Sequence, residues 1–165
     1  TVLDLTTAAP RILRPGAVTR EQLARALGKE IEEAASWERN KTGIPPSPGL
    51  KYRHYAPKTA LCLVEGEPRA VEEKLKQLCL QKKEEGMKLG LLLSKETTPS
   101  FRGCYIKALG SRSQPRELAQ NLYTALRELD EQNLDFILAE GYQGEGVVLA
   151  LMNRLRKAAA EIIKA

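Results

Sequence analysis

A stretch framed by prolines divides this chain into two parts. Residues 47–57 read SPGLKYRHYAP, with Pro45, Pro46 and Pro48 at one end and Pro57 at the other. Proline fixes φ, lacks a backbone N–H and biases the residue before it toward extended geometry. Neither a helix nor a central strand suits that spacing, so we expect an extended, semi-rigid linker.

The linker has an unusual chemistry. Five residues, Lys51, Tyr52, Arg53, His54 and Tyr55, combine cations with flat rings, and no other histidine occurs in the sequence. In an extended backbone, neighbouring side chains point to opposite sides. Cations bind phosphate and rings stack on bases, so this run suits a nucleotide or RNA. The alternative is a solvated basic linker whose tyrosines rest on domain surfaces.

The positive charge of the chain is concentrated in the same region. Of the net charge of +5, residues 36–58 carry +4, whereas residues 1–35 are neutral and residues 59–165 carry +1. A localised basic strip favours an anionic partner.

The first part of the chain predicts two short strands and a helix. The strands are expected over residues 1–6 and 11–14, and the helix begins at Thr19, which forms a capping box with Gln22, and stops at Gly28. These elements contain too little apolar surface to form a core, so we expect them to be the remnant of a larger domain. Residues 30–37 are polar and predict a further helical turn.

After Pro57 the pattern alternates between strands and helices. Strands are expected over residues 60–64, 88–93, 104–109 and 134–139, with helices over 68–85, from 113 or 115 to 129, and from 145 or 146 onward along an apolar stripe that reaches Ile163. Such alternation predicts a mostly parallel sheet in a three-layer α/β/α, Rossmann-like domain.

Three stretches carry a resemblance to a known family. The linker SPGLKYRHYAP, the opening TVLDLTTAAPRILRPGAVT and the tail GYQGEGVVLALMNRLRKAA resemble the two-domain threonylcarbamoyl-AMP synthases. The resemblance implies a remnant of the YrdC-like catalytic domain at 1–35, a basic, proline-rich linker or lid at 36–58, and a Rossmann-like C-terminal domain at 59–165. Most of the YrdC-like domain, with the residues that hold most of the substrate, is missing from this sequence.

The resemblance also implies a function. The family makes threonylcarbamoyl-adenylate and pyrophosphate from L-threonine, bicarbonate and ATP, with Mg²⁺ bound through the nucleotide. The product feeds threonylcarbamoylation of an adenosine in tRNA, which implies a cytoplasmic enzyme that works with the tRNA-modification machinery. The implied nucleotide- or substrate-binding residues are Arg14, Lys51, Tyr52, Arg53 and His54. No catalytic residue is identified, and this portion alone is expected to be inactive.

Other interpretations remain open at several positions. Arg14 on residue type alone is a surface strand residue beside the Pro15-Gly16 turn. A different class of function is a non-catalytic RNA- or partner-binding module that uses the linker and the last helix. That helix carries Asn153, Arg154, Arg156 and Lys157 on a face expected to be exposed, and a merely solvated face is the simpler interpretation.

The glycine-rich turn at Gly141, Gly144 and Gly146 precedes the last helix, where phosphates can bind. Its spacing is GxxGxG rather than GxGxxG, and Glu140 and Glu145 are expected to repel a phosphate. We therefore predict a tight turn and not a dinucleotide site.

The sequence does not indicate a metal site, a membrane-spanning helix or a secretory signal. Cys62, Cys79 and Cys104 form no CxxC pair and have one histidine to join them, so we expect three reduced, largely buried thiols and no metal site. No apolar run approaches the roughly 20 residues of a membrane helix, and the start of the sequence lacks a secretory signal pattern.

Overall fold

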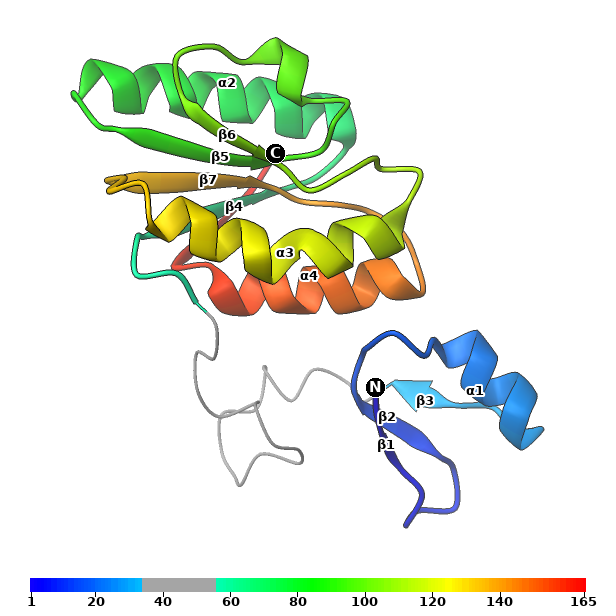
Figure 1. Cartoon of the computed structure of the whole chain (residues 1–165). Helices are drawn as coiled ribbons and strands as arrows, with labels where there is room; N and C mark the ends of the chain where they lie inside the picture. Colours follow the sequence, from blue (N-terminus) through cyan, green and yellow to red (C-terminus); the bar gives the residue numbers. More distant parts are fainter. Residues whose placement is uncertain (34–55) are drawn as a thin grey trace.

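The computed structural model describes residues 1–33 and 56–165 (Figure 1). In chain order the elements are β1 (Val2–Asp4), β2 (Arg11–Arg14), α1 (Arg20–Leu27), β3 (Glu32–Glu33), β4 (Leu61–Glu65), α2 (Pro68–Glu84), β5 (Leu89–Leu93), the short 3₁₀ helix η2 (Thr98–Ser100), β6 (Tyr105–Ala108), α3 (Pro115–Asp130), β7 (Phe136–Glu140), α4 (Val147–Ala158) and β8 (Glu161–Lys164). Within these residues no helix has the length and apolar character needed to cross a membrane.

The first part forms a small sheet in the order β1-β2-β3, with α1 beside it. The predicted capping box is confirmed, because the Thr19 side chain accepts from the Gln22 N–H and the Gln22 side chain accepts from the Thr19 N–H. Gly28 ends α1 with a φ of 62°, a left-handed conformation that suits glycine.

The helical turn expected from residue 30 is wrong where the structure describes it. Glu32 and Glu33 form β3, parallel to β2. The Glu32 N–H donates to the Pro10 carbonyl at 2.9 Å, and the Glu32 carboxylate pairs with Arg11 at 3.2 Å. Pairing with a strand some twenty residues earlier decides the conformation here over local propensity.

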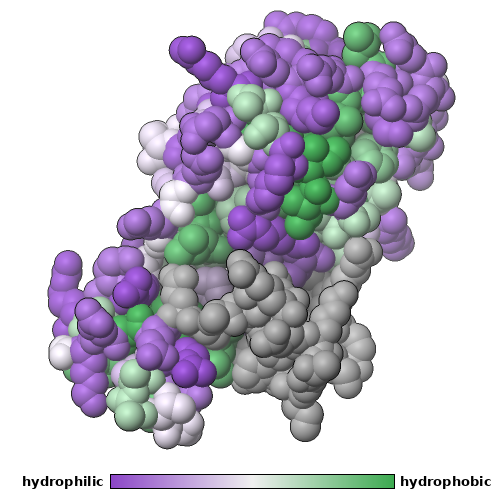
Figure 2. All heavy atoms as spheres, turned by 180° about the vertical axis from the view of Figure 1, so that it is seen from behind, coloured by the Kyte–Doolittle hydropathy of each residue, from purple (hydrophilic) through white to green (hydrophobic). Residues whose placement is uncertain are grey.

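This part leaves apolar side chains in solvent, as expected for a segment that cannot form its own core. Helix α1 has no buried residue, and Leu5 is 61% exposed and Val18 47% exposed. In Figure 2 a mostly hydrophilic surface is interrupted by hydrophobic patches on both parts of the molecule.

The second part is a five-stranded parallel sheet in the order β6-β5-β7-β4-β8. Helix α2 covers one face, where Val71, Leu75 and Cys79 pack against alternate strand residues such as Val64 and Leu91. Helices α3 and α4 cover the other face and pack on the intervening strand residues. The predicted three-layer α/β/α fold is confirmed, and its four expected strands are displaced by no more than two residues at either end.

The expected course of the last helix is wrong. Helix α4 ends at Ala158, and residues Glu161–Lys164 form β8 instead of continuing the apolar stripe to Ile163. The Ala160 N–H donates to the Leu61 carbonyl at 2.8 Å, which starts a parallel ladder along β4. The β-branched Ile162 and Ile163 suit a strand, and their pairing covers what would otherwise be an open edge of β4.

Candidate functional site

Arg14 is the one predicted site residue that falls within residues 1–33 and 56–165. It ends β2, opposite Val2 of β1, and is partly buried. The turn that follows is held close to the start of β1: the Thr1 hydroxyl donates to the Val18 carbonyl, and a Cβ on Gly16 would lie 2.2 Å from the Thr1 nitrogen. A side chain at position 16 would therefore clash with Thr1, and Arg14 stands at the strand end just before this close approach.

The other predicted contacts, Lys51, Tyr52, Arg53 and His54, lie outside the described residues. The structure therefore does not test whether these residues lie near Arg14. Their role in binding a nucleotide stays a prediction.

A groove lies between the first part and the helices α3 and α4. Its volume is about 600 Å³, and Gly16, Ala17 and Val18 form one wall while Arg116 and Arg154 contribute cations to the other. Beyond the groove, Thr19 lies close to the start of α4, because a Cβ built on Gly146 would be 3.4 Å from the Thr19 methyl. The turn after Arg14 thus faces the C-terminal domain.

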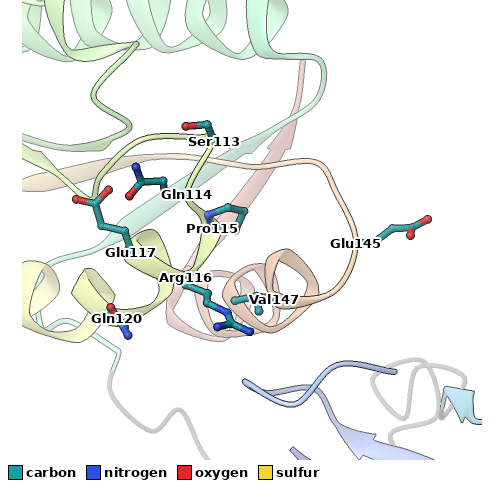
Figure 3. Close-up of a pocket in the computed structure, with 8 residues that line it drawn as sticks. All are labelled: Ser113, Gln114, Pro115, Arg116, Glu117, Gln120, Glu145 and Val147. Atoms are coloured by element: carbon teal, nitrogen blue, oxygen red, sulfur yellow. The ribbon is translucent and has the colours of Figure 1, made fainter. Parts of the chain in front are cut away.

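The glycine-rich turn borders a second cavity, of about 730 Å³, at the start of α3 and α4 (Figure 3). Its charged lining is mixed: Arg116 is a cation, whereas Glu117 and Glu145 are carboxylates. Glu117 is already paired with Lys95 at 3.0 Å, and in Figure 3 the Glu145 side chain points away from the α3 residues. Gly146 has a φ of 59° and is the N-cap residue immediately before α4, as expected for a tight turn feeding a helix.

A buried polar network that the sequence analysis did not identify lies where β5 and β7 end. Glu140 is 1% exposed and accepts from the Ser94 N–H at 2.6 Å, the Ser94 hydroxyl at 3.1 Å, the Thr97 hydroxyl at 3.2 Å and Arg112 Nε at 2.7 Å. The repulsion of a phosphate by Glu140 stays a prediction, and in the structure its charge is matched by Arg112 while its oxygens accept the hydrogen bonds above. One sequence feature points to this network, because Ser94 and Glu140 both stand at the carboxyl end of an apolar strand.

A second buried carboxylate, Glu65, stands at the end of β4. It accepts from Arg156 Nε at 2.6 Å and from Lys164. Burial opposes ionisation of Glu65, but the hydrogen bonds from Arg156 and Lys164 outweigh it and hold its pKa below the ordinary value. The sequence leaves RNA or partner binding open for Arg156 and favours a solvated face, whereas in the structure Arg156 neutralises a buried charge and ties α4 to the sheet. Its neighbours Asn153, Arg154 and Lys157 are each partly buried.

The cysteines are free thiols, as predicted, with Cys62 and Cys79 buried and Cys104 partly buried. Burial raises the pKa of Cys62 and of Cys79 to about 11 each, which keeps both protonated at neutral pH. Within the described ranges no three histidine, cysteine, aspartate or glutamate residues are grouped to hold a metal ion.

Comparison with known proteins identifies a family and individual proteins whose sequences are similar to this chain. Residues 18–160 match the family model described as threonylcarbamoyl-AMP synthase, C-terminal domain. The chain is 39% identical over 160 residues to the threonylcarbamoyl-AMP synthase of Bacillus subtilis and 40% identical over 165 residues to that of Pyrococcus abyssi. These alignments cover 96% and 99% of this chain but 44% and 46% of the relatives, so the chain spans less than half of their length.

Solved structures agree with the sequence comparison. A crystal structure of Pyrococcus abyssi Sua5 complexed with L-threonine matches with a TM-score of 0.83 and 38% identity, covering 100% of this chain and 47% of that chain. The C-terminal Sua5 domain from Pyrococcus horikoshii matches with a TM-score of 0.54 and 35% identity, covering 67% of this chain and all of that chain. Because the family model spans α1 through α4 and these relatives match at both levels, the chain belongs to the family of threonylcarbamoyl-AMP synthase C-terminal domains.

Proposed function

We propose that this chain is the C-terminal portion of an L-threonylcarbamoyladenylate synthase that acts in threonylcarbamoyladenosine modification of tRNA. The observation that carries the proposal is the match to Sua5 over the whole chain, which includes the first part as well as the α/β domain. In the proposed reaction L-threonine and bicarbonate form a carbamate. ATP then converts the carbamate into a mixed anhydride with AMP and releases pyrophosphate.

The described residues suggest how this portion contributes. Arg14 stands at a strand end beside the Pro15-Gly16 turn, where a guanidinium can bind a nucleotide phosphate. Lys51, Tyr52, Arg53 and His54 belong to the linker that we propose covers the catalytic cleft. Such a lid excludes water and protects a labile carbamate and anhydride.

Magnesium belongs to the proposal through ATP. We propose that Mg²⁺ is bound to the phosphates of the nucleotide in the longer enzyme. Its chemistry there is to neutralise phosphate charge during adenylate formation. We propose a cytoplasmic location for that enzyme.

Pyrophosphate release tests the proposal directly. The longer protein that includes the YrdC-like domain should release pyrophosphate when L-threonine, bicarbonate and ATP are all present, and the 165-residue chain alone should not. Release by the isolated chain would place the catalytic residues in this portion. No release by the longer protein would remove the proposed activity.

The lid requires a second experiment in the longer protein. Arg53→Ala should lower adenylate formation by at least about tenfold, since loss of one charge-assisted hydrogen bond costs about 1.5–3 kcal/mol. The matched control is Lys58→Ala, which removes a linker cation whose backbone N–H, rather than its side chain, is hydrogen bonded to Asp130. Equal rates for Arg53→Ala, Tyr52→Ala, His54→Ala and the unaltered enzyme would leave the linker a passive tether.

Direct RNA binding is the alternative from a different class. It is supported by the charge of the linker, +4 over residues 36–58. Salt-dependent binding of tRNA by the 165-residue chain without ATP would favour it. Protection of the linker from proteolysis only when ATP is added to the longer protein would favour the lid.

A further inference from the structure

At one place in the sheet, the connections that leave two neighbouring strands run in opposite directions. Strands β5 and β7 are neighbours at the centre, but the chain leaves β5 toward β6 at one edge and leaves β7 toward β8 at the other. In open α/β sheets this divergence leaves a crevice beyond the carboxyl ends of the strands, where ligands bind. Here the crevice lies beyond Ser94, which follows β5, and Glu140, which ends β7, and these two residues are hydrogen bonded to each other.

The crevice holds a small cavity with an unsatisfied group. The cavity is about 70 Å³, and its lining includes Arg112, Gly141, Tyr142 and Gln143. The Tyr142 hydroxyl oxygen is buried and has no hydrogen-bond partner among the described residues. A buried hydroxyl without a partner is destabilising, so its presence indicates a bound group or water.

The groups left over in this cavity are donors. The oxygens of Glu140 are occupied by Ser94, Thr97 and Arg112, which removes them as acceptors. Arg112 uses Nε and Nη2 in that network, and no hydrogen bond joins its Nη1 to the residues described. Burial, with the nearby Glu140 charge, raises the pKa of Tyr142 well above its ordinary value, so its hydroxyl keeps a proton to donate.

The N-termini of three helices lie at the same edge of the sheet as the cavity and also favour a negatively charged ligand. Pro68, the first residue of α2, lines the cavity, and α3 and α4 begin at the same edge of the sheet (Figure 1). None of the three helices has a side-chain N-cap, whereas α1 has a complete capping box. Pro68 has no backbone N–H, so the start of α2 brings the positive end of the helix dipole to the cavity wall but no hydrogen-bond donor from that residue.

We propose that this cavity binds a small oxyanion of the size of inorganic phosphate, held by the Tyr142 hydroxyl and Arg112 beside the positive end of α2. A ligand rich in acceptors satisfies the donors that the protein leaves unpaired. The small volume excludes a ribose or a base, so the site takes a free anion and not a nucleoside. The inference does not depend on the proposed synthase activity.

Titration of the 165-residue chain with inorganic phosphate tests this site, with sodium chloride keeping the ionic strength constant. Binding is followed by calorimetry and by the amide chemical shifts of Gly141, Tyr142 and Arg69. We expect saturable binding and shifts confined to the carboxyl edge of the sheet. Tyr142→Phe keeps the ring but removes the unpaired hydroxyl, and it should weaken phosphate binding by about tenfold while the chain stays folded.

The matched control is Tyr105→Phe, which removes a hydroxyl from an exposed tyrosine on the edge strand β6. It should bind phosphate as tightly as the unaltered chain. Absence of saturable binding, or equal affinity in Tyr142→Phe and Tyr105→Phe, would overturn the proposal and assign the cavity to water. Tighter binding of AMP than of phosphate would overturn the assignment to a free anion.

Discussion

The Asp130 carboxylate, in the last turn of α3, accepts a hydrogen bond from the backbone N–H of Lys58 at 3.0 Å. The adjacent Thr59 N–H donates to the other oxygen of the same carboxylate at 3.2 Å. A single side chain therefore fixes the place where the linker joins the C-terminal domain, 72 residues away in sequence.

Removal of this anchor should destabilise the chain. Asp130→Ala leaves two backbone N–H groups without their acceptor, and we expect the free energy of unfolding to fall by about 1.5–3 kcal/mol. Urea denaturation followed by circular dichroism measures the change. Glu131→Ala, at the exposed neighbouring position, is the control and should shift the midpoint little. The same midpoint in both variants would show that the linker is held by other contacts.

Glu65 should make the chain sensitive to acid. Its folded-state pKa is lowered from 4.5, so its stabilising contribution is complete above about pH 5 and disappears as the pH falls through the folded-state pKa. In Glu65→Gln, denaturation midpoints at pH 7 should drop by an amount equivalent to about 1–3 kcal/mol, and the further loss on acidification should be smaller than in the unaltered chain.

Glu85→Gln is the control for this pH dependence. The pKa of Glu85 is also lowered, by hydrogen bonds from Lys82 and Gln81, but its side chain is 38% exposed. Solvent screens such a pair, so its removal should change the acid profile less. Parallel acid profiles in Glu65→Gln and the unaltered chain would contradict the role given to Glu65.

The thiols should differ in reactivity. Because burial holds the pKa of Cys62 and Cys79 near 11, almost none of either thiol is ionised at pH 7.5. Cys104 is partly exposed, so iodoacetamide should label it first in the folded chain. Peptide mass spectrometry after timed labelling measures the order, and labelling of Cys62 at the rate of Cys104 without denaturant would contradict the burial described here.

The five-stranded domain should fold without the first part and the linker. Its two clusters of buried side chains draw only on residues from Leu61 onward. A protein of residues 59–165 should therefore unfold in one cooperative thermal transition. A matched protein of residues 59–160, which lacks β8 and with it Lys164, should melt at a markedly lower temperature. The absence of a transition in the first protein would place the domain boundary elsewhere.

The sequence predicts correctly those elements whose conformation is decided by residues close to them in the chain. Thr19 and Gln22 form the capping box that their spacing indicates, and Gly28 takes the left-handed conformation that ends α1. The apolar run at Leu89–Leu93 is buried on both faces, as a continuous apolar strand predicts. These features depend on neighbours within a few residues.

The errors lie where distant partners decide the outcome. Ile162 and Ile163 continue a helical stripe by their spacing, but β4 offers an edge to which they pair. The polar network of Glu140 was missed because Arg112 and Ser94 lie 28 and 46 residues away from it in sequence. Burial of a carboxylate depends on such partners, and no local pattern encodes them.

The position of β4 in its sheet has a consequence during synthesis. It is the first strand of the domain to leave the ribosome, yet its two neighbours are β7 and β8, the last strands to be made. Its final register joins Glu65 to Lys164, 99 residues later. Until those residues emerge, both edges of an apolar strand stay open to pairing with other chains. The nascent domain therefore has an interval of exposure that ends only with its final strand, and a chaperone that binds extended apolar segments would act on β4 during that interval.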